Sequence, residues 1–508
     1  MSQKKLGTIL SYLNIIISNT ISLIYTPYML RMLGQSEYGL YGTANSFISY
    51  LSILSFGIGG AYIRFNAKCR ANNDKEEEKR LNGMFLTIFS IMSIFVLVGG
   101  IIFIVLAGSL VKNTFTADEL FKLRVLMLIM TLSMILTFVF NVVTMALQAY
   151  EKFAFIRGVL LLSGIVTPII NVVAMRLGGK AIAISLVSLS VSFTVYIIYF
   201  IYAWNKIVLR FSFRGFNKEV MKEIFTFSGF LFLNSITDTI TFSTDSMVLS
   251  SVKGSAAVAV YTVGANFKNY FQNFSSSISA VFAPQVNQIV AQNKDSDELN
   301  EIFIRVGRVQ FYVVSLIIIG YIFIGQDFIM LWAGKGYEEA FMIGLLLMLA
   351  VFVPAFQNVG IEIQKAKNMH KARSVVYFFI ALINVIITIP LSKYWGGIGA
   401  ALATMICMFF GTVIFMNYYY WKHVKLDMRR FWKSIASILP GYVLPISAGF
   451  IINRYFKINS YYGILISAFI IVVIFSVSVW FISMNEFEKN LFRGPVIRIW
   501  KKLHSRSK

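Results

Sequence analysis

The chain has 508 residues, of which 57% are hydrophobic and only 14% are charged. Soluble domains carry about 25% charged residues, so this composition argues against a water-soluble protein. The formal net charge of +23 would suit a nucleic-acid-binding protein if the basic residues formed one patch. They lie instead in short loops between apolar segments, which argues against a nucleic-acid partner and favours contact with anionic membrane lipids.

Apolar segments long enough to cross a bilayer recur along the chain to about residue 484. They predict an all-α polytopic membrane protein with about fourteen transmembrane helices, the first of which is a retained helix and not a cleaved signal peptide. The expected helices cover residues 7–31, 40–64, 83–108, 123–149, 154–177, 180–204, 225–251, 256–290, 306–331, 338–364, 373–393, 397–421, 435–455 and 460–484. Most Lys and Arg residues fall at the two termini and in loops after even-numbered helices, which predicts cytoplasmic N- and C-termini.

An internal repeat joins positions about 220 residues apart, as in many secondary transporters. The matching segments are 34–41 with 254–261, 140–159 with 356–375, and 178–179 with 396–397. The repeat predicts two parallel six-helix lobes and two additional C-terminal helices. The expected domains are an N-lobe (1–205), a cytoplasmic linker (206–224), a C-lobe (225–421), a second cytoplasmic linker (422–434), the helix pair 435–484 and a basic cytoplasmic tail (485–508).

Polar residues inside the expected helices mark a candidate transport pathway, because such groups are costly in lipid. In the seventh helix Asn234, Asp238, Thr241 and Asp245 share one face, with Asp238 near mid-membrane. This face predicts a cation or proton site that couples transport to an ion gradient. The alternative is that each acid makes only a structural hydrogen bond to a neighbouring helix.

Three other expected helices carry candidate substrate-binding groups. Lys268 and Gln272 lie on one face of the eighth helix, where an ammonium group suits a phosphate but equally suits a structural pair with Asp238 or Asp245. The remaining set contains amides, hydroxyls and one acid suited to sugar hydroxyls or to interhelical hydrogen bonds: Thr137, Asn141, Thr144 and Gln148 in the fourth helix, and Gln357, Asn358, Glu362 and Gln364 in the tenth.

Cysteine and histidine usage argues against a metal or redox site. Cys69 and Cys407 are far apart in the sequence, and the three His residues show no metal-ligand spacing. We therefore expect no catalytic residues, no bound metal and no cofactor beyond a coupling ion, Na⁺ or H⁺. A membrane enzyme such as a glycan polymerase or acyltransferase is an alternative, but none of the expected outward loops exceeds about 20 residues.

Three short segments resemble the Wzx-type polysaccharide flippases of the multidrug/oligosaccharidyl-lipid/polysaccharide exporter superfamily. They are YMLRMLGQSEYGLY at 28–41, GIGGA at 57–61 and WGGIGAALAT at 395–404. The resemblance extends over all fourteen helices in helix count, repeat and length. It implies a MATE-like, V-shaped pair of lobes around a cavity that opens alternately to each side and has a cationic interior for a prenyl-pyrophosphate head group.

The resemblance also implies roles for particular residues. In relatives that flip the peptidoglycan precursor, a sodium site lies among helices 7, 11 and 12, and the matching positions here are Asp238, Asn384, Thr388 and Thr404. The polar helix faces described above add Asp245 and Glu362 as candidate coupling acids. The cavity cations that the family leads us to expect correspond here to Lys268, Arg31, Arg64 and Arg157.

The resulting expectation is a flippase that moves undecaprenyl-pyrophosphate-linked oligosaccharide from the inner to the outer leaflet of a bacterial cell membrane. Its expected partners are that lipid-linked substrate, membrane lipids and the polysaccharide polymerase machinery. The alternative within the superfamily is a cation-coupled multidrug antiporter, which the acids Asp238, Asp245 and Glu362 would suit. Twelve helices suffice for that class, so the two additional helices favour the flippase.

Overall fold

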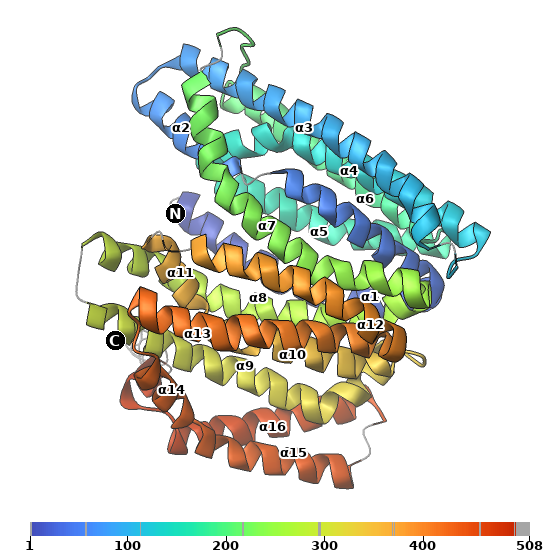
Figure 1. The fold of residues 1–508 in the computed structure, drawn as a ribbon, viewed down its shortest axis with the longest axis vertical. Coiled ribbons are helices and arrows are strands. Elements are labelled where there is room, and N and C mark those ends of the chain that lie inside the picture. Colours follow the sequence, from blue (N-terminus) through green and yellow to red (C-terminus); the bar gives the residue numbers. More distant parts are fainter. Residues whose placement is uncertain are drawn as a thin grey trace, which may run out of the picture. The chain divides into compact units, whose positions relative to one another are not determined.

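A computed structural model describes residues 3–55, 58–111, 113–215, 218–292, 296–367, 369, 371–456, 459–491 and 493. Within these residues the chain is helical and contains no strand (Figure 1). This confirms the all-α fold that the apolar segments predict. The helices follow one another through short connections, so nearly all main-chain polar groups are hydrogen-bonded within their own helix, as hydrocarbon requires.

The first six expected helices are all present as helix in the structure. The boundary between the first two differs from the expectation. Helix α1 (Gln3–Leu51) runs through both of the first two expected helices and breaks at Gly34, where φ is 74° and ψ is 174°. A left-handed φ of this kind favours glycine. The second expected helix then continues through the short η1 (Ser52–Ser55) to α2 (Gly59–Ala71). The next four are α3 (Lys75–Leu110), α4 (Ala117–Ala149), α5 (Phe153–Arg176) and α6 (Ala181–Lys206).

The rest of the chain follows the same pattern. The longer helices are α7 (Lys218–Lys253), α8 (Ser255–Ala291), α9 (Ser296–Trp332), α10 (Glu339–Phe356), α12 (Lys371–Met408), α15 (Val443–Tyr455) and α16 (Tyr461–Ile482). Short elements lie between them: α11 (Asn358–Ala366), η2 (Phe409–Phe415), α13 (Met416–Tyr419), η3 (Tyr420–Val424), α14 (Met428–Ala436) and η4 (Leu439–Tyr442). Helix α12 has its own glycine break at Gly396, between the eleventh and twelfth expected helices.

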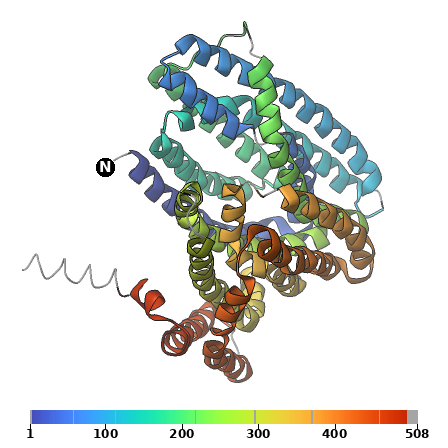
Figure 2. The same ribbon diagram turned by 60° about the vertical axis from the view of Figure 1, so that its left-hand side comes forward.

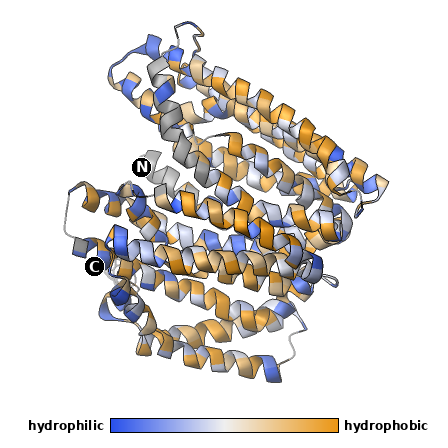
Figure 3. Ribbon diagram, viewed as in Figure 1, coloured by the Kyte–Doolittle hydropathy of each residue, from blue (hydrophilic) through white to orange (hydrophobic). Residues whose placement is uncertain are grey.

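The described residues contain 10 stretches long and apolar enough to span a membrane. Two of these stretches, Ile17–Ala71 and Ala372–Val424, each contain two expected helices, and the more polar α7 and α8 account for the remaining two. About fourteen helices are therefore confirmed. Figure 3 shows apolar residues along most of the helices, and side chains such as Ile94, Phe95 and Val105 are at least 60% exposed. Exposed apolar side chains at this density are expected where lipid is the solvent.

The chain forms two compact units. Unit 1 contains Met1–Thr262 and Ser374–Ala403, and unit 2 contains Val263–Arg373 and Thr404–Lys508. Unit 1 therefore holds α1–α7, the first turns of α8 and most of α12. This grouping places the seventh and eleventh expected helices with the first six, whereas the repeat assigns them to the C-lobe. The lobe and linker boundaries drawn from the repeat stay a prediction.

Unit 1 is built around an aromatic core. Tyr62 and Phe85 meet edge to face with ring centroids 5.0 Å apart, and both side chains are fully buried. The Tyr62 hydroxyl donates to Asn82 Oδ1 at 2.6 Å, and Glu78 accepts hydrogen bonds from Asn66 and Tyr150. These bonds join α2, α3 and the end of α4 without leaving the tyrosine hydroxyls unpaired in the core.

In unit 2 a buried ion pair fastens the two additional helices to α9. Arg308 Nε donates to Glu488, and its Nη1 donates to the carbonyl oxygen of Ser434 at 2.7 Å. Arg308 is 6% exposed and Glu488 is 1% exposed. Since Ser434 lies in α14 and Glu488 follows α16, one guanidinium holds α9, α14 and the end of α16 together. Helices α15 and α16 run side by side next to α9 (Figures 1 and 2).

We predict that Arg308→Ala lowers the free energy of unfolding by about 3–5 kcal/mol, because it leaves the Glu488 carboxylate buried without its partner. Thermal unfolding of the purified protein in detergent measures the change. Arg305→Ala is the matched control, since Arg305 lies one turn away, is 50% exposed and pairs with Glu301 at the surface. That surface pair contributes about 0–1 kcal/mol. Equal losses in the two variants would contradict a structural role for the buried pair.

Candidate functional site

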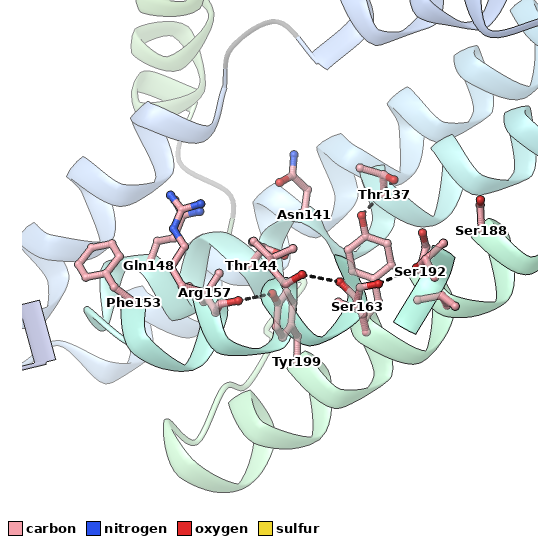
Figure 4. Close-up of a pocket in the computed structure, with 16 residues that line it drawn as sticks. Thr137, Asn141, Thr144, Gln148, Phe153, Arg157, Ser163, Ser188, Ser192 and Tyr199 are labelled. Atoms are coloured by element: carbon pink, nitrogen blue, oxygen red, sulfur yellow. Dashed lines mark hydrogen bonds between the residues drawn. The ribbon is translucent and has the colours of Figure 1, made fainter. Parts of the chain in front are cut away.

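A polar pocket lies within unit 1 between α4, α5 and α6 (Figure 4). Its volume is about 540 Å³, within the range typical of ligand sites. Its lining consists of Thr137, Asn141, Thr144, Gln148, Phe153, Ile156, Arg157, Leu160, Ser163, Thr167, Ser188, Val191, Ser192, Val195, Tyr196 and Tyr199. The structure thus brings together Asn141, Gln148 and Arg157, which the sequence nominates from two different helices.

The hydroxyl groups of this pocket are oriented by main-chain hydrogen bonds. Ser163 donates to the Leu160 carbonyl oxygen at 2.9 Å, Thr167 to that of Ser163 at 2.7 Å, and Ser188 to that of Ile184 at 3.0 Å. A hydroxyl that donates backwards to its own helix keeps its lone pairs for a ligand. These positions therefore have lone pairs free to accept hydrogen bonds from hydroxyl groups, while the amides of Asn141 and Gln148 can both donate and accept.

Two tyrosines complete the pocket wall on α6. The Tyr196 hydroxyl donates to Thr137 Oγ1 at 3.1 Å, and the Tyr199 hydroxyl donates to the Ile156 carbonyl oxygen at 3.0 Å. The Tyr196 ring also stacks on Phe140 with centroids 5.4 Å apart. Both rings are thereby held in place. Tyr199 is 2% exposed and only supports the wall, whereas the half-buried Tyr196 ring lies beside hydroxyl groups, an arrangement that suits packing of a sugar ring.

Arg157 is the one charged residue in this lining, and Figure 4 shows it at the same end as Gln148 and Phe153. It is half-buried on α5. A guanidinium offers several N–H donors in a fixed plane and pairs with phosphate oxygens through two bonds at once. The pocket therefore combines one cationic end with a neutral remainder rich in hydroxyls and amides.

The other predicted cavity cations lie elsewhere. Arg31 and Arg64 are exposed and do not line this pocket, and the Arg64 guanidinium lies 5.9 Å from the ring centroid of Phe65. Lys268 belongs to unit 2, where it is 5% exposed and lines neither this pocket nor the smaller one described next. Their roles in substrate binding stay predictions.

Unit 2 contains a smaller polar pocket of about 330 Å³. Gln272, Asn358 and Glu362 line it together with Ser275, Ser276, Ser279, Ala280, Val351, Pro354 and Ala355. The predicted residue Gln357 points elsewhere, because its amide donates to Asn417 Oδ1 at 3.0 Å. A residue that the sequence analysis missed, Gln310, supports the lining by donating to Ser279 Oγ at 2.7 Å. A polar amide among the apolar residues of α9 is the sequence feature that could have identified Gln310 as part of a polar site.

A buried carboxylate cluster lies where α7, α8 and α12 meet within unit 1. Asp245 is fully buried, and its Oδ2 accepts a hydrogen bond from the Tyr261 hydroxyl at 2.5 Å while its Oδ1 accepts one from Thr388 Oγ1 at 3.2 Å. Thr388 Oγ1 also lies 3.3 Å from Asn384 Oδ1. Carboxylate, hydroxyl and amide oxygens converge here, a donor set that suits a hard cation such as Na⁺.

The membership of this cluster differs from the one expected from the resemblance. Asn384 and Thr388 are present, and the acid that accepts the Thr388 hydrogen bond is Asp245, whereas Asp238 lies two turns earlier and its side chain is exposed. Thr404 is fully buried but belongs to unit 2, and the side chain of Asn234 lies outside the described residues. Among the side chains that the structure describes, no three His, Cys, Asp or Glu residues form a metal-binding group.

A tight seam joins the first turn of α8 to α1 and α4 within unit 1. Glu119 Oε1 accepts hydrogen bonds from Ser36 at 2.6 Å and from Ser255 at 2.8 Å, and Thr114 Oγ1 donates to the Ser250 carbonyl oxygen at 2.8 Å. Next to it, a Cβ built on Gly39 would overlap the carbonyl oxygen of Ser255. The sequence analysis did not identify Glu119, because an acid in the first turn of a helix is common and does not by itself indicate a contact with distant segments.

The fold is shared with several solved transporters. The chain is similar to the lipid II flippase MurJ in an inward closed conformation, with a TM-score of 0.66 and 16% identity over 97% of this chain and 99% of that one. It is also similar to an inward-facing multidrug resistance MATE family transporter, with a TM-score of 0.63 and 14% identity over 82% of this chain and 99% of that one. The chain is therefore a multi-pass membrane protein with the helical fold of these MurJ and MATE transporters.

Sequence comparison gives the family. The profile of the family described as polysaccharide biosynthesis protein matches residues 5–290, more than half of the chain. A relative, the uncharacterized membrane protein EpsK of Bacillus subtilis (strain 168), is 21% identical over 442 residues, covering 81% of this chain and 83% of that protein. The chain belongs to the polysaccharide biosynthesis protein family, and the resemblance seen in its sequence motifs is confirmed.

We predict that Gly39→Ala opens the seam, because the added Cβ cannot coexist with the Ser255 carbonyl group. Cross-linking reports the change. Ser36→Cys and Ser255→Cys, introduced together with Cys69→Ser and Cys407→Ser, should form a disulfide in the parent chain and form it more slowly after Gly39→Ala. Gly320→Ala is the control, since a Cβ at Gly320 meets nothing within 4 Å. An unchanged cross-linking rate would contradict the close approach at Gly39.

Proposed function

We propose that this protein is a flippase that moves undecaprenyl-pyrophosphate-linked oligosaccharide from the inner to the outer leaflet of the bacterial cytoplasmic membrane. The glycan would serve a capsule, O-antigen or similar polymer. The observation that carries the proposal is the pocket between α4, α5 and α6, where oriented hydroxyls and amides surround a cavity with a single arginine at one end. Membership of the polysaccharide biosynthesis protein family supports the same conclusion.

The pocket matches such a head group in two respects. Sugar hydroxyls both donate and accept hydrogen bonds, and the back-bonded hydroxyls of Ser163, Thr167 and Ser188 supply acceptors beside the amides of Asn141 and Gln148. A pyrophosphate needs positive charge, which Arg157 supplies with planar geometry. The lipid tail needs no pocket, because it remains in the hydrocarbon around the helices.

Movement across the membrane requires that the site open to one side at a time. The Glu119 seam supports this mechanism, because it ties α8 to α1 and α4 at the ends of the helices that the charge distribution places on the outer side. In the proposed cycle the seam is intact while the cytoplasmic side is open, and it separates to release the substrate into the outer leaflet. The cytoplasmic termini are part of the same proposal.

The buried cluster around Asp245 is the proposed coupling site for Na⁺ or H⁺. Asp245 lies in α7 and Tyr261 in α8, and Thr388 lies in α12, so occupation by a cation changes the contacts of three helices at once. A charge in this position is tolerated inside a membrane only where protein groups surround it. Thr404 and Glu362 stay predictions as coupling residues, and the choice between Asp245 and Asp238 is tested below.

A cation-coupled multidrug antiporter is the second candidate, and the pocket of unit 2 is the observation that favours it. Glu362 lines that pocket as its one acid, and its side chain is 27% exposed beside Lys365. An organic cation would seek such a carboxylate. The ion pair with Lys365 reduces that attraction, so the arginine pocket of unit 1 carries the preferred proposal.

The deciding experiment offers a prenyl-pyrophosphate oligosaccharide and an organic-cation dye, in parallel, to proteoliposomes under imposed Na⁺ or H⁺ gradients. We expect movement of the lipid-linked glycan. In the same assay, Arg157→Gln should reduce the rate by about 10- to 100-fold, because a charge-assisted phosphate contact contributes about 1.5–3 kcal/mol. Arg176→Gln, which changes an exposed arginine at the end of the same helix, is the control and should retain the parent rate.

Two outcomes would overturn this assignment. Movement of the dye without the glycan would make the protein a multidrug antiporter, and elongation or modification of the glycan without movement would make it an enzyme. Glycan movement that is equally fast in the Arg157→Gln variant would retain the flippase and remove Arg157 from its binding site.

We also predict that Asp245→Asn abolishes the dependence of transport on the imposed gradient, because the amide keeps the shape of the carboxylate but not its charge. Asp238→Asn is the matched comparison in the same helix and should leave the gradient dependence in place, since the Asp238 side chain is exposed whereas that of Asp245 is fully buried. The reverse result, with coupling lost only in the Asp238 variant, would restore the assignment that follows from the sequence.

A further inference from the structure

Helix α14 (Met428–Ala436) connects the first twelve expected helices to the two additional ones, and it has one apolar and one basic face. The apolar residues Met428, Phe431 and Ile435 are buried against unit 2. The Phe431 ring stacks on Phe303 with centroids 4.5 Å apart, and it packs over Gly307, where a Cβ would come within 2.6 Å of its ring. The apolar face is thus covered by protein and does not need lipid.

One capping hydrogen bond and three hydrogen bonds to neighbouring elements hold this helix, and the latter three fix its rotation about its axis. The Asp427 carboxylate caps it by accepting from the Arg430 main-chain N–H at 2.9 Å, and the Asp427 main-chain N–H donates to Asn300 Oδ1 at 2.8 Å. The Trp432 indole donates to Asn417 Oδ1 at 2.8 Å, and Arg308 donates to the Ser434 carbonyl oxygen at 2.7 Å. With one face held in this way, the opposite face is kept outward.

The outward face is strongly basic. Arg429, Arg430 and Lys433 are exposed on α14, and the exposed Lys422 and Lys425 precede it in η3 and the following turn. The acid in this stretch is Asp427, whose carboxylate is already engaged in capping. We call these five basic residues, 422 to 433, the basic collar.

The basic collar lies between two segments whose apolar and aromatic side chains face outward. Before it, Tyr418 is 46% exposed and Trp421 is 53% exposed. After it, Leu439 is 51% exposed and Val443 is 61% exposed at the beginning of the next helix. Tyrosine and tryptophan gather at the boundary between hydrocarbon and head groups. Flanking segments of this kind place α14 at the membrane surface, and the charge distribution assigns that surface to the cytoplasmic side.

We propose that the basic collar is a binding site for anionic phospholipid head groups, of the phosphatidylglycerol type, in the cytoplasmic leaflet. Its guanidinium and ammonium groups project at head-group depth, where phosphate oxygens are their natural partners. An acidic soluble protein would carry the same negative charge as these head groups. It would, however, have to approach past the exposed Trp421 and Tyr418, which belong in lipid. This site is independent of the glycan-binding pocket in unit 1.

The test uses the full chain, purified in a neutral detergent, delipidated and titrated with phosphatidylglycerol or phosphatidylcholine. Bound lipids are counted by native mass spectrometry, and the melting temperature is followed in parallel because a ligand that binds the folded state raises it. We expect preferential retention of phosphatidylglycerol, lost at about 1 M salt, where the Debye length falls to about 3 Å. The combined variant Arg429→Gln, Arg430→Gln and Lys433→Gln should bind phosphatidylglycerol more weakly by a factor of about ten or more.

The matched control removes the same charge elsewhere. Lys68→Gln, Lys75→Gln and Lys206→Gln are exposed positions of unit 1 on the same expected side of the membrane, and this variant should retain the preference. If the collar variant fails to fold, Arg429→Lys with Arg430→Lys keeps the charge and must keep the preference, and the salt dependence of the parent chain must still hold. Equal retention of the two lipids, a preference that survives high salt, or the same loss in the control variant would overturn the proposal.

Discussion

Hydrocarbon offers no hydrogen bonds, and this constraint governs where each polar side chain of the protein lies. A buried polar group must either pair within the protein or face a protein-lined cavity, because leaving it unpaired costs about 1–3 kcal/mol and more when it is charged. The Arg308–Glu488 pair shows the first solution and holds three helical segments together. The pocket between α4, α5 and α6 shows the second, with its hydroxyls satisfied by their own helices and turned toward a space of about 540 Å³.

The same constraint explains why the fold could be predicted from the sequence. Every spanning segment must satisfy its main chain as a helix, so length and hydropathy give the number of helices almost directly. Two glycines of the internal repeat have a structural role that the sequence could indicate. Gly34 and Gly396 both adopt a positive φ at breaks between consecutive helices. The composition of the compact units could not be predicted in the same way, because the packing of the seventh and eleventh expected helices depends on contacts between residues far apart in the chain.

The sites were predicted less completely, for an equally physical reason. Helical periodicity put Asp238 and Asp245 on one face, but it could not tell which acid meets Thr388, since 143 residues separate Asp245 from that partner. Depth judged from the middle of the helix favoured Asp238, which is exposed. Glu488 fell in the expected basic tail and Glu119 in the loop expected before residue 123. Nothing in either local sequence indicates that the first is buried against Arg308 or that the second receives two serine hydroxyls from distant segments.

The position of the carboxylate cluster relative to the seam gives the proposed coupling a physical route. Asp245 and Tyr261 are hydrogen-bonded across the α7–α8 connection, and the Ser250 carbonyl and Ser255 hydroxyl that form the seam lie between them in the sequence. One helical hairpin therefore carries both features. A cation at Asp245 competes for the oxygen that now accepts the Tyr261 hydroxyl, and any resulting shift of α8 acts on Ser255 less than two turns away. Because the main chains at Gly39 and Ser255 are in close contact, a shift of α8 away from α1 would separate the seam, which is the kind of discrete rearrangement that alternating access needs.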